Sequence, residues 1–190
     1  MTSRLVHDTS AIDELREVYC QRYFERRYQG WCNNYDKQYD PFSEWWMLAG
    51  GETFCRVTHA NSDRTIPGLS TIENYLAKEA RFCEINNFIY SDKGSGIALI
   101  KDVIARKRRE GFEAIYCLVD THSKYRQAFN LNTSEFGFKS TGLHSIFPDI
   151  LYRISQRSVV WELLKLKLDN EQSAAELYSQ LEAEGEIKRG

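Results

Sequence analysis

The sequence predicts an α/β fold of the mixed α+β kind. A mostly antiparallel sheet of six or seven strands is expected, with a central β-α-β crossover, flanking helices and a C-terminal helix. Apolar residues make up 42% of the 190 residues and aromatic residues 13%, which is enough for a hydrophobic core. The pair Gly50-Gly51 separates two strand-like runs, which is typical of a hairpin. Further on, a strand, a glycine turn, an amphipathic helix and a strand follow one another, which predicts a right-handed crossover between parallel strands.

The N-terminal half is predicted to contain one long helix and three strands. Apolar and aromatic side chains recur every three or four residues from Ile12 to Tyr23, which predicts a helix over residues 10–28 with Ser10 as its cap. A loop rich in Asn, Asp, Gly and Tyr follows and runs past Pro41. The remaining elements are a hairpin of two strands, a loop, one or two helical turns and a long strand, predicted at residues 44–49, 52–59, 60–70, 71–79 and 80–90.

The C-terminal half begins with a glycine-bearing turn over residues 91–96 and an amphipathic helix over residues 97–110, which Gly111 ends. A long, charged, weakly amphipathic pattern from Val159 to Glu184 predicts a terminal helix. We therefore expect one domain over residues 1–158 and a C-terminal helical extension over 159–190. Between them we expect a buried strand, a short helix and two further strands at residues 113–119, 123–131, 135–140 and 150–156.

The charge balance narrows the classes of function. The 25 Lys and Arg residues nearly balance the 27 Asp and Glu residues, which argues against nucleic-acid binding as the main function. The uncharged apolar runs are far shorter than the roughly 20 residues of a membrane helix, so no membrane span is predicted. The N-terminus has no apolar core of a signal peptide, and the predicted location is the cytoplasm.

Neither a disulfide framework nor a metal site is predicted. The number of cysteines is odd, their spacing is wide and no CxxC pair occurs, so free thiols in a reducing compartment are expected. The histidines are scattered, which makes a metal site improbable. The residues concerned are Cys20, Cys32, Cys55, Cys83, Cys117, His59, His122 and His144.

The strongest local signal for chemistry is the turn from Tyr90 to Ala98. It joins a strand end to a helix start, where the first N–H groups lack partners and the helix dipole favours an anion. Its glycines let the backbone approach a phosphate closely, although the turn lacks both the Walker A ending and the dinucleotide-binding spacing. The competing interpretation is a turn with a structural role only. The turn and the end of the preceding strand, where we predict phosphate binding, comprise Phe88, Ile89, Tyr90, Lys93, Gly94, Ser95, Gly96, Ile97 and Ala98.

The context of this turn resembles the GCN5-related N-acetyltransferase superfamily. The pattern basic-Gly-x-Gly-x-Ala follows a long strand, and Phe136-Gly137-Phe138 comes about forty residues later. In that superfamily the turn holds the pyrophosphate or phosphopantetheine arm of an acyl thioester. The resemblance implies this role for Lys93, Gly94, Gly96 and Ala98, with a lysine in place of the usual arginine or glutamine. It thereby makes the whole set of residues at this turn and strand end the predicted binding site of an acyl donor.

A narrower resemblance, to the acyl-homoserine-lactone synthases, runs from about Leu15 to Phe138. It is carried by the segments Leu15–Tyr19, Gly30-Trp31, Tyr39-Asp40, Trp46–Ala49, Cys55–Val57 and Glu84–Phe88. Lys37 and Asn87 stand where those enzymes carry an acid and an arginine that help engage S-adenosylmethionine. The sequence therefore looks more like the related N-acyl amino acid synthases. These take an acyl chain from an acyl carrier protein and acylate the amine of an amino acid such as tyrosine.

The acyl transfer that this resemblance implies needs a general base, a hydrogen-bond donor to the oxyanion that forms, and a proton for the leaving thiolate. We predict Glu84 as the general base, with an exposed or ion-paired strand residue (through Arg56 or Arg81) as the competing interpretation. The oxyanion donor is expected to be a backbone N–H near Phe88 to Tyr90. As the proton donor we predict Tyr152, with Tyr125 as an alternative and a packing role as the competing interpretation for both.

The acceptor is predicted to bind through its carboxylate and ammonium groups. Arginine suits a carboxylate, and an aspartate suits an ammonium group, although a salt bridge between the first helix and the loop is an equal alternative. The residues are Arg16, Asp40 and Arg56, with Trp31 in the aromatic loop as a wall of the acyl or acceptor site.

The co-substrate is expected to be an acyl carrier protein's phosphopantetheine thioester or an acyl-coenzyme A, with no tightly bound cofactor. A basic run on the crossover helix is either a solvated face or a docking site for an acidic carrier protein. This run is Arg106, Lys107, Arg108 and Arg109.

The predicted function is therefore that of an N-acyltransferase, which moves a long-chain acyl group to the amine of an amino acid. The alternatives are an acyl-homoserine-lactone-type signal synthase and an acetyl-coenzyme A-dependent acetyltransferase. A domain that binds an acyl thioester or a partner without catalysis is the alternative from a different class.

Overall fold

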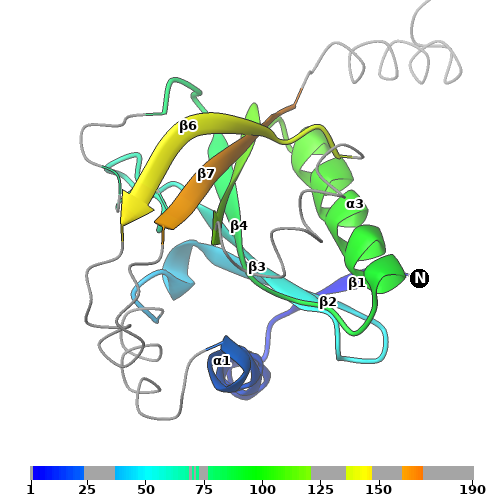
Figure 1. The fold of residues 1–190 in the computed structure, drawn as a ribbon. Helices are drawn as coiled ribbons and strands as arrows, with labels where there is room; N and C mark the ends of the chain where they lie inside the picture. Colours follow the sequence, from blue (N-terminus) through cyan, green and yellow to red (C-terminus); the bar gives the residue numbers. More distant parts are fainter. Residues whose placement is uncertain are drawn as a thin grey trace, which may run out of the picture.

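A computed structural model describes residues 2–23, 37–68, 70, 72, 77–120, 136–146 and 160–168. These residues form one seven-stranded sheet with the strand order β1-β2-β3-β4-β5-β7-β6 (Figure 1). All neighbouring strands are antiparallel except β4 and β5. The elements are β1 (Ser3–Val6), α1 (Thr9–Tyr23), the 3-10 helix η2 (Asp40–Phe42), β2 (Ser43–Leu48), β3 (Phe54–His59), β4 (Phe82–Ile89), α3 (Lys93–Arg109), β5 (Ala114–Asp120), β6 (Lys139–Ile146) and β7 (Val160–Lys167).

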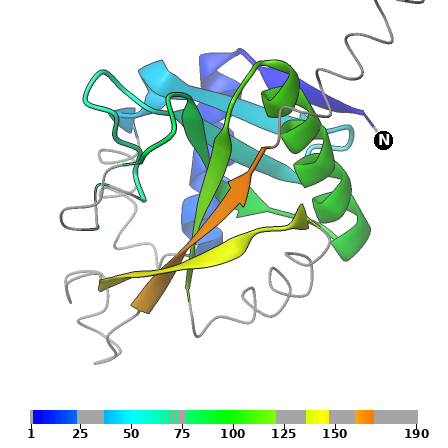
Figure 2. The ribbon, with the colours of Figure 1, turned by 90° about the horizontal axis from the view of Figure 1, so that it is seen from above.

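The predicted mixed, mostly antiparallel sheet with a central crossover is confirmed. Helix α3 connects β4 to β5, and these two strands form the parallel pair. Strands β2 and β3 form the predicted hairpin, in which Gly50 and Gly51 take positive φ angles of 108° and 80°. Side chains other than glycine rarely adopt such angles, which explains the glycine pair at this turn. Figure 2 shows β6 and β7 at the end of the sheet that lies away from β1 and β2.

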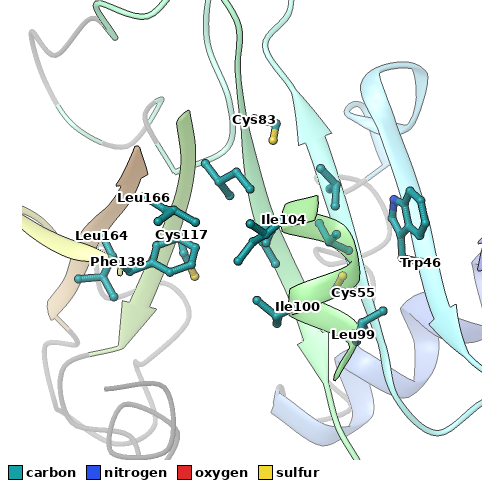
Figure 3. Close-up of a cluster of buried hydrophobic side chains, with 14 of the residues drawn as sticks. Trp46, Cys55, Cys83, Leu99, Ile100, Ile104, Cys117, Phe138, Leu164 and Leu166 are labelled. Carbon is teal, nitrogen blue, oxygen red and sulfur yellow. The ribbon is translucent and has the colours of Figure 1, made fainter. Parts of the chain in front are cut away.

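The two helices cover opposite faces of the sheet (Figure 1). On the α3 face, Leu99, Ile100, Val103 and Ile104 of the helix pack against apolar side chains of β2 to β5 and β7 (Figure 3). Leu99 and Val103 are fully buried. Burial of each such side chain contributes about 1.5–3 kcal/mol, so this apolar layer is the main source of stability. On the α1 face, Leu15 of α1 packs with Val6, Trp45, Phe54 and Ile89.

Three buried thiols lie under α3, namely those of Cys55, Cys83 and Cys117 (Figure 3). Burial raises the pKa of each of these thiols well above its usual value. Because the thiolate is the nucleophilic form of cysteine, these three residues serve as core side chains. Cys20 is also a buried free thiol, whereas Cys32 lies outside the described residues.

The helix predicted from Val159 to Glu184 is wrong at its start, because residues 160–167 form β7. This strand pairs with β5 on one side and β6 on the other. Leu163 and Leu164 point to opposite faces and both are buried, a pattern that suits an interior strand and that a helix-period reading misses. The predicted boundary after residue 158 therefore falls just before a strand of the sheet.

Other elements differ in smaller ways. Strand β1 was not predicted, because it has only four residues and only Leu5 and Val6 are apolar. The strand predicted at 135–140 lies at Lys139–Ile146. The predicted elements at 123–131 and 150–156 lie outside the described residues, as does the chain after residue 168. In the described part of the chain, no helix is long and apolar enough to cross a membrane.

Lys107 does not belong to an exposed basic face, which corrects that part of the sequence analysis. Its side chain is fully buried, and its Nζ donates to Glu44 Oε2 at 2.7 Å and to Glu110 Oε2 at 2.9 Å. Because an ammonium group has donors only, His59 Nε2 at 3.0 Å accepts from the same Nζ. The helical period explains why Lys107 is buried and the three arginines of the run are not. Lys107 lies on the same face of α3 as Val103 and Ile104, whereas the arginines lie on other faces.

The first prediction concerns the pH dependence of stability at His59. Burial and the neighbouring Lys107 lower the pKa of His59 in the folded state. As the pH falls from 7 to 5, the unfolded chain therefore takes up a proton, near a pKa of about 6.5, that the folded chain resists. The free energy of unfolding falls in this window, and His59→Gln makes the fall smaller because glutamine does not titrate.

Urea unfolding at pH 7 and pH 5 measures the effect in the wild type and in His59→Gln. The same substitution at an exposed histidine, His144→Gln, is measured alongside as the matched variant. An equal fall of the unfolding free energy in wild type and His59→Gln would contradict the assignment.

Candidate functional site

Strand β4 carries a bulge next to the start of α3. On β3 only Cys55 lies between the paired residues Phe54 and Arg56, whereas their partners on β4 are Ile89 and Asn86. Two residues of β4, Asn87 and Phe88, thus stand opposite one residue of β3. Asn87 has a φ of 47°, in the left-handed region, as a bulged residue often does. The bulge bends β4 away from regular pairing at its C-terminal end.

Strands β4 and β5 part near the middle of β4. Within the described residues, their parallel register joins Phe82 with Ala114, Cys83 with Ile115, and Glu84 with Tyr116. Both strands continue beyond this last pair, β4 to Ile89 and β5 to Asp120. The parting strands and the bulge therefore lie along the same stretch of β4, from Glu84 to Phe88.

Glu84 is the last β4 residue before the strands part, and it is buried with an exposed fraction of 2%. The backbone N–H of Gly68, in the loop between β3 and β4, donates to Glu84 Oε2 at 2.8 Å. The competing interpretation of Glu84 as an exposed residue is therefore wrong. Arg81 bonds the carbonyl of Glu110 rather than serving as a surface partner for Glu84.

A row of polar side chains continues from Glu84 across the α1 face. Arg56 Nε donates to Asn86 Oδ1 at 2.7 Å, and Asn86 Nδ2 donates to Thr58 Oγ1 at 3.2 Å. Arg56 and Thr58 are buried, with 1% and 0% exposed. Sequence analysis missed Thr58 and Asn86, although Glu84 and Asn86 alternate with the apolar residues Cys83 and Ile85 on β4, which is a signal for such a row.

The predicted acceptor residues lie around one tryptophan. The guanidinium carbons of Arg16 and Arg56 lie 5.7 Å and 5.8 Å from the ring centroid of Trp45, so the structure brings these two arginines together. Arg16 Nη2 donates to both carboxylate oxygens of Asp40 at 2.6 Å, and Arg16 also pairs with Asp13. The contact between Arg16 and Asp40 is thus the salt bridge between helix and loop that sequence analysis offered as the alternative.

Tyr116 is a third residue that sequence analysis did not find. It stands opposite Glu84 on β5, is fully buried, and its hydroxyl donates to Glu79 Oε2 at 2.7 Å. Burial raises the pKa of Glu79, but hydrogen bonds from Lys165 and Tyr116 outweigh it and lower that pKa. Both predicted proton donors, Tyr152 and Tyr125, lie outside the described residues, as does Trp31.

The start of α3, where the sequence predicts a phosphate site, already carries the carboxylate of Asp92. Asp92 caps the helix, and its Oδ1 accepts from the backbone N–H of Ser95 at 2.9 Å. Hydrogen bonds from the backbone and side chain of Ser95 lower the pKa of Asp92, so the carboxylate is charged. The Ser95 hydroxyl also lies 2.9 Å from Thr53 Oγ1. An approaching phosphate would therefore meet a fixed negative charge beside the exposed Lys93 and Gly94.

Gly96 has a packing role at this turn. A Cβ at position 96 would lie 3.2 Å from Phe88 Cζ and from Tyr90 Cβ. The rings of Phe88 and Tyr90 are 5.4 Å apart and form the surface on which the first turn of α3 rests. The missing side chain of Gly96 therefore brings the helix start up to the bulged end of β4, where the donor residues are predicted.

No metal centre accompanies these groups: among the described ranges, no cluster of three His, Cys, Asp or Glu side chains is suited to hold a metal ion.

The second prediction compares the two glycines at the start of α3. Gly96→Ala places a methyl group against Phe88 and Tyr90, and overpacking of this kind lowers the free energy of unfolding by about 1–3 kcal/mol. Gly94→Ala is the matched control, because an added Cβ there contacts only the exposed side chain of Asp92. We expect it to change stability by less than about 1 kcal/mol. Urea unfolding measures both, and equal effects would contradict the packing role of Gly96.

Comparison with known proteins gives matches at the level of fold. No protein-family model and no curated protein sequence matches the chain. Among solved structures, FeeM, an N-acyl amino acid synthase from uncultured soil microbes, aligns with a TM-score of 0.61 and 12% identity, over 88% of this chain and 90% of that one. The ribosomal-protein-S18-alanine N-acetyltransferase from Escherichia coli aligns with a TM-score of 0.56 and 12% identity, over 88% and 94%.

A further match is yncA from Salmonella typhimurium, a proposed acetyltransferase whose structure contains its cofactor acetyl-CoA. It aligns with a TM-score of 0.51 and 14% identity, over 89% of this chain and 94% of that one. The alignments span nearly the whole length of each neighbour, so the likeness covers the complete fold. At these identities the comparisons establish the fold of the chain, while its substrates are a matter for the chemistry of its own residues.

Proposed function

We propose that this chain, which has the fold of the GCN5-related N-acetyltransferases, is an N-acyltransferase that transfers an acyl group from a thioester to an amine. More specifically, the acceptor is an amino acid and the donor carries a long acyl chain. The observation that carries the proposal is the buried carboxylate of Glu84 at the point where β4 and β5 part. Two of the neighbouring structures named above, FeeM and the ribosomal-protein-S18-alanine N-acetyltransferase, are acyltransferases, which supports the same reaction class.

The reaction needs a base for the amine of the acceptor and a hydrogen-bond donor that polarises the thioester carbonyl. The acceptor nitrogen attacks the carbonyl carbon of the thioester, and Glu84 accepts the proton that the nitrogen loses. A backbone N–H near Phe88 to Tyr90 stabilises the oxygen that becomes negatively charged. The carbon–sulfur bond then breaks, and the leaving thiolate takes a proton from a tyrosine, which we assign to Tyr152 on the sequence pattern. The products are an amide and a free thiol.

The α1 face supplies the groups for an amino acid acceptor. Arg56 is the proposed partner of its carboxylate, since a guanidinium matches a carboxylate in shape and charge and Asn86 orients the Arg56 side chain. Arg16 and Asp40, joined in their ion pair, form the adjoining wall, and Trp31 belongs to the same site in this proposal. The aromatic ring of Trp45 holds both arginines in place.

The donor is proposed to be an acyl carrier protein rather than free coenzyme A. The charged Asp92 at the start of α3 disfavours the diphosphate of coenzyme A more than the single phosphodiester of phosphopantetheine. Arg106 and Arg109 are exposed near the other end of α3, with Arg108 partly exposed between them. These three arginines are the proposed contact for an acidic carrier protein, and Lys107 takes no part because it is buried.

An acetyl-coenzyme A-dependent N-acetyltransferase is the second candidate, because the yncA structure contains acetyl-CoA. A signal synthase of the acyl-homoserine-lactone type is a further alternative on the sequence resemblance. The acceptor distinguishes it, since that reaction uses S-adenosylmethionine while the present proposal uses an unmodified amino acid.

The third prediction tests the reaction class. Expression of the wild type in a bacterial host gives new long-chain N-acyl amides in organic extracts, detected by mass spectrometry. With purified protein and a saturating acyl-carrier donor, Glu84→Gln lowers kcat by about 100-fold to 10,000-fold, as expected for loss of a general base. The KM for the donor changes little, because Glu84 lies on the acceptor side.

Glu113→Gln provides a control, because Glu113 lies outside the site and its carboxylate contacts only the exposed backbone at Ala80. A fully active Glu84→Gln would show that the base is another group. Absence of acylated products with carrier-protein and coenzyme A donors alike would contradict the acyltransferase itself.

The fourth prediction concerns the donor. Asp92→Asn keeps a good helix cap but removes the negative charge, so coenzyme A binds about 2-fold to 5-fold more tightly at low salt. Calorimetric titration measures the dissociation constant. Pantetheine, which lacks the diphosphate, is the control ligand and is expected to bind both variants equally. Unchanged affinity for coenzyme A in Asp92→Asn would place the diphosphate away from the start of α3.

A further inference from the structure

We propose that Gly68 is a positioning residue for Glu84. Its backbone N–H holds the Glu84 carboxylate in the orientation that faces the acceptor, and its missing side chain is what lets the loop reach that carboxylate. This inference rests on the proposed function for its catalytic meaning. The contact between the two residues can be tested without any substrate.

The contact is short and enclosed. Gly68 N lies 2.8 Å from Glu84 Oε2, and both residues are buried. A hydrogen bond to a charged oxygen is about twice as strong as one between neutral groups, and a buried carboxylate needs such donors. The Gly68 amide therefore limits the rotation of the Glu84 side chain at the place where the proton of the amine is to be received.

The loop that carries Gly68 is built to hold this position. The Asn61 side chain accepts from the backbone N–H groups of Asp63 and Thr65, which closes the first turn of the loop. Ile66 is fully buried in the cluster with Phe82 and Tyr116, which anchors the loop to the α1 face. Two residues after this anchor the chain reaches Gly68, so the amide is fixed to the sheet rather than free to move with the surface.

Space explains why this residue is a glycine. A Cβ at position 68 would lie 2.7 Å from Glu84 Oε1, 3.2 Å from Cδ and 3.4 Å from Oε2. Real Cβ atoms essentially never come within 3.0 Å of a non-bonded heavy atom of a distant residue, so either the carboxylate or the loop would have to move. The backbone of Gly68 is not in the left-handed region, so the requirement is for space and not for an unusual φ.

Other charged and titratable groups share the α1 face with Glu84. These groups come from α1, β3, β5, β7 and the segment before β4, and the contacts described above for them do not involve Gly68. They are Arg16, Arg56, Tyr116, Lys165 and Glu79. An effect of Gly68→Ala that depends on Glu84 therefore separates the proposed contact from a general disturbance of this face.

The fifth prediction uses Gly68→Ala. The methyl group displaces the Glu84 carboxylate, and misplacement of a reacting group by about 1 Å lowers kcat on the order of 10-fold to 100-fold. The KM values for donor and acceptor change little, because neither binding site loses a group. Ser70→Ala is the control, since it removes a loop hydrogen bond to Pro67 that does not involve Glu84. We expect that variant to keep the wild-type kcat.

A double-mutant cycle separates positioning from a structural role. In a Glu84→Gln background, Gly68→Ala is expected to lower kcat less than about 2-fold, because the group that it positions is already absent. In the double variant Gly68→Ala, Glu84→Asp, the shorter aspartate side chain makes room for the methyl group. We expect this double variant to be more active than Gly68→Ala alone or Glu84→Asp alone. Full additivity in the cycle would overturn the inference.

A spectroscopic measurement covers the case in which no acyl transfer is found. The amide proton of Gly68 should move upfield in Glu84→Gln, because a neutral oxygen is a weaker acceptor than a carboxylate. An unmoved resonance would overturn the contact itself. An inactive Glu84→Gln with a fully active Gly68→Ala would overturn the positioning role alone. A fully active Glu84→Gln would instead show that the proposed base, not the contact, is wrong.

Discussion

The parallel pairing of β4 with β5 is the constraint on which the rest of the molecule depends. A parallel pair requires a crossover connection, and α3 supplies it by packing Leu99 and Val103 against the sheet. The pairing extends over three residue pairs only, and the strands part after Glu84 and Tyr116. Because β3 and β7 continue to pair along the outer edges of the two strands, the sheet stays one body while it opens in the middle.

The two faces of the sheet divide stability and chemistry between them. The α3 face is mainly apolar, with the buried Lys107 bonded to Glu44 and His59 at one end, and its cysteines have thiols that burial keeps protonated. The α1 face holds buried charges on Arg16, Arg56 and Glu84, each of which would cost several kilocalories per mole if left without partners. Ion pairs and hydrogen bonds compensate for that cost. Charged groups that are buried in spite of a large desolvation cost are typical of functional sites, so a function is expected on this face.

Local patterns in the sequence predicted the hairpin, the β4-α3-β5 unit and the place of Glu84 on β4. They did not predict β7, because the adjacent apolar pair Leu163-Leu164 interrupts the two-residue alternation that Leu164 to Lys167 otherwise shows. They also could not show the partners of Lys107 or of Glu84, since Glu44 and Gly68 are distant in sequence and meet these residues only in the folded chain. The cap at Asp92 lies within the motif, but a short polar residue before a helix suits a cap as well as a phosphate site.

The cap at Asp92 also constrains how a donor is held. In a helix start without an acid, the first amides and the helix dipole attract phosphate. Here Ser95 N is already bonded to a carboxylate, so this end of α3 contributes less attraction than the glycine pattern alone implies. In the proposed function, the binding energy for an activated acyl group must then come mainly from the parted strands and from contacts with the rest of the donor. A carrier protein would offer such contacts over a wide surface, which is the reason for proposing it rather than a free coenzyme.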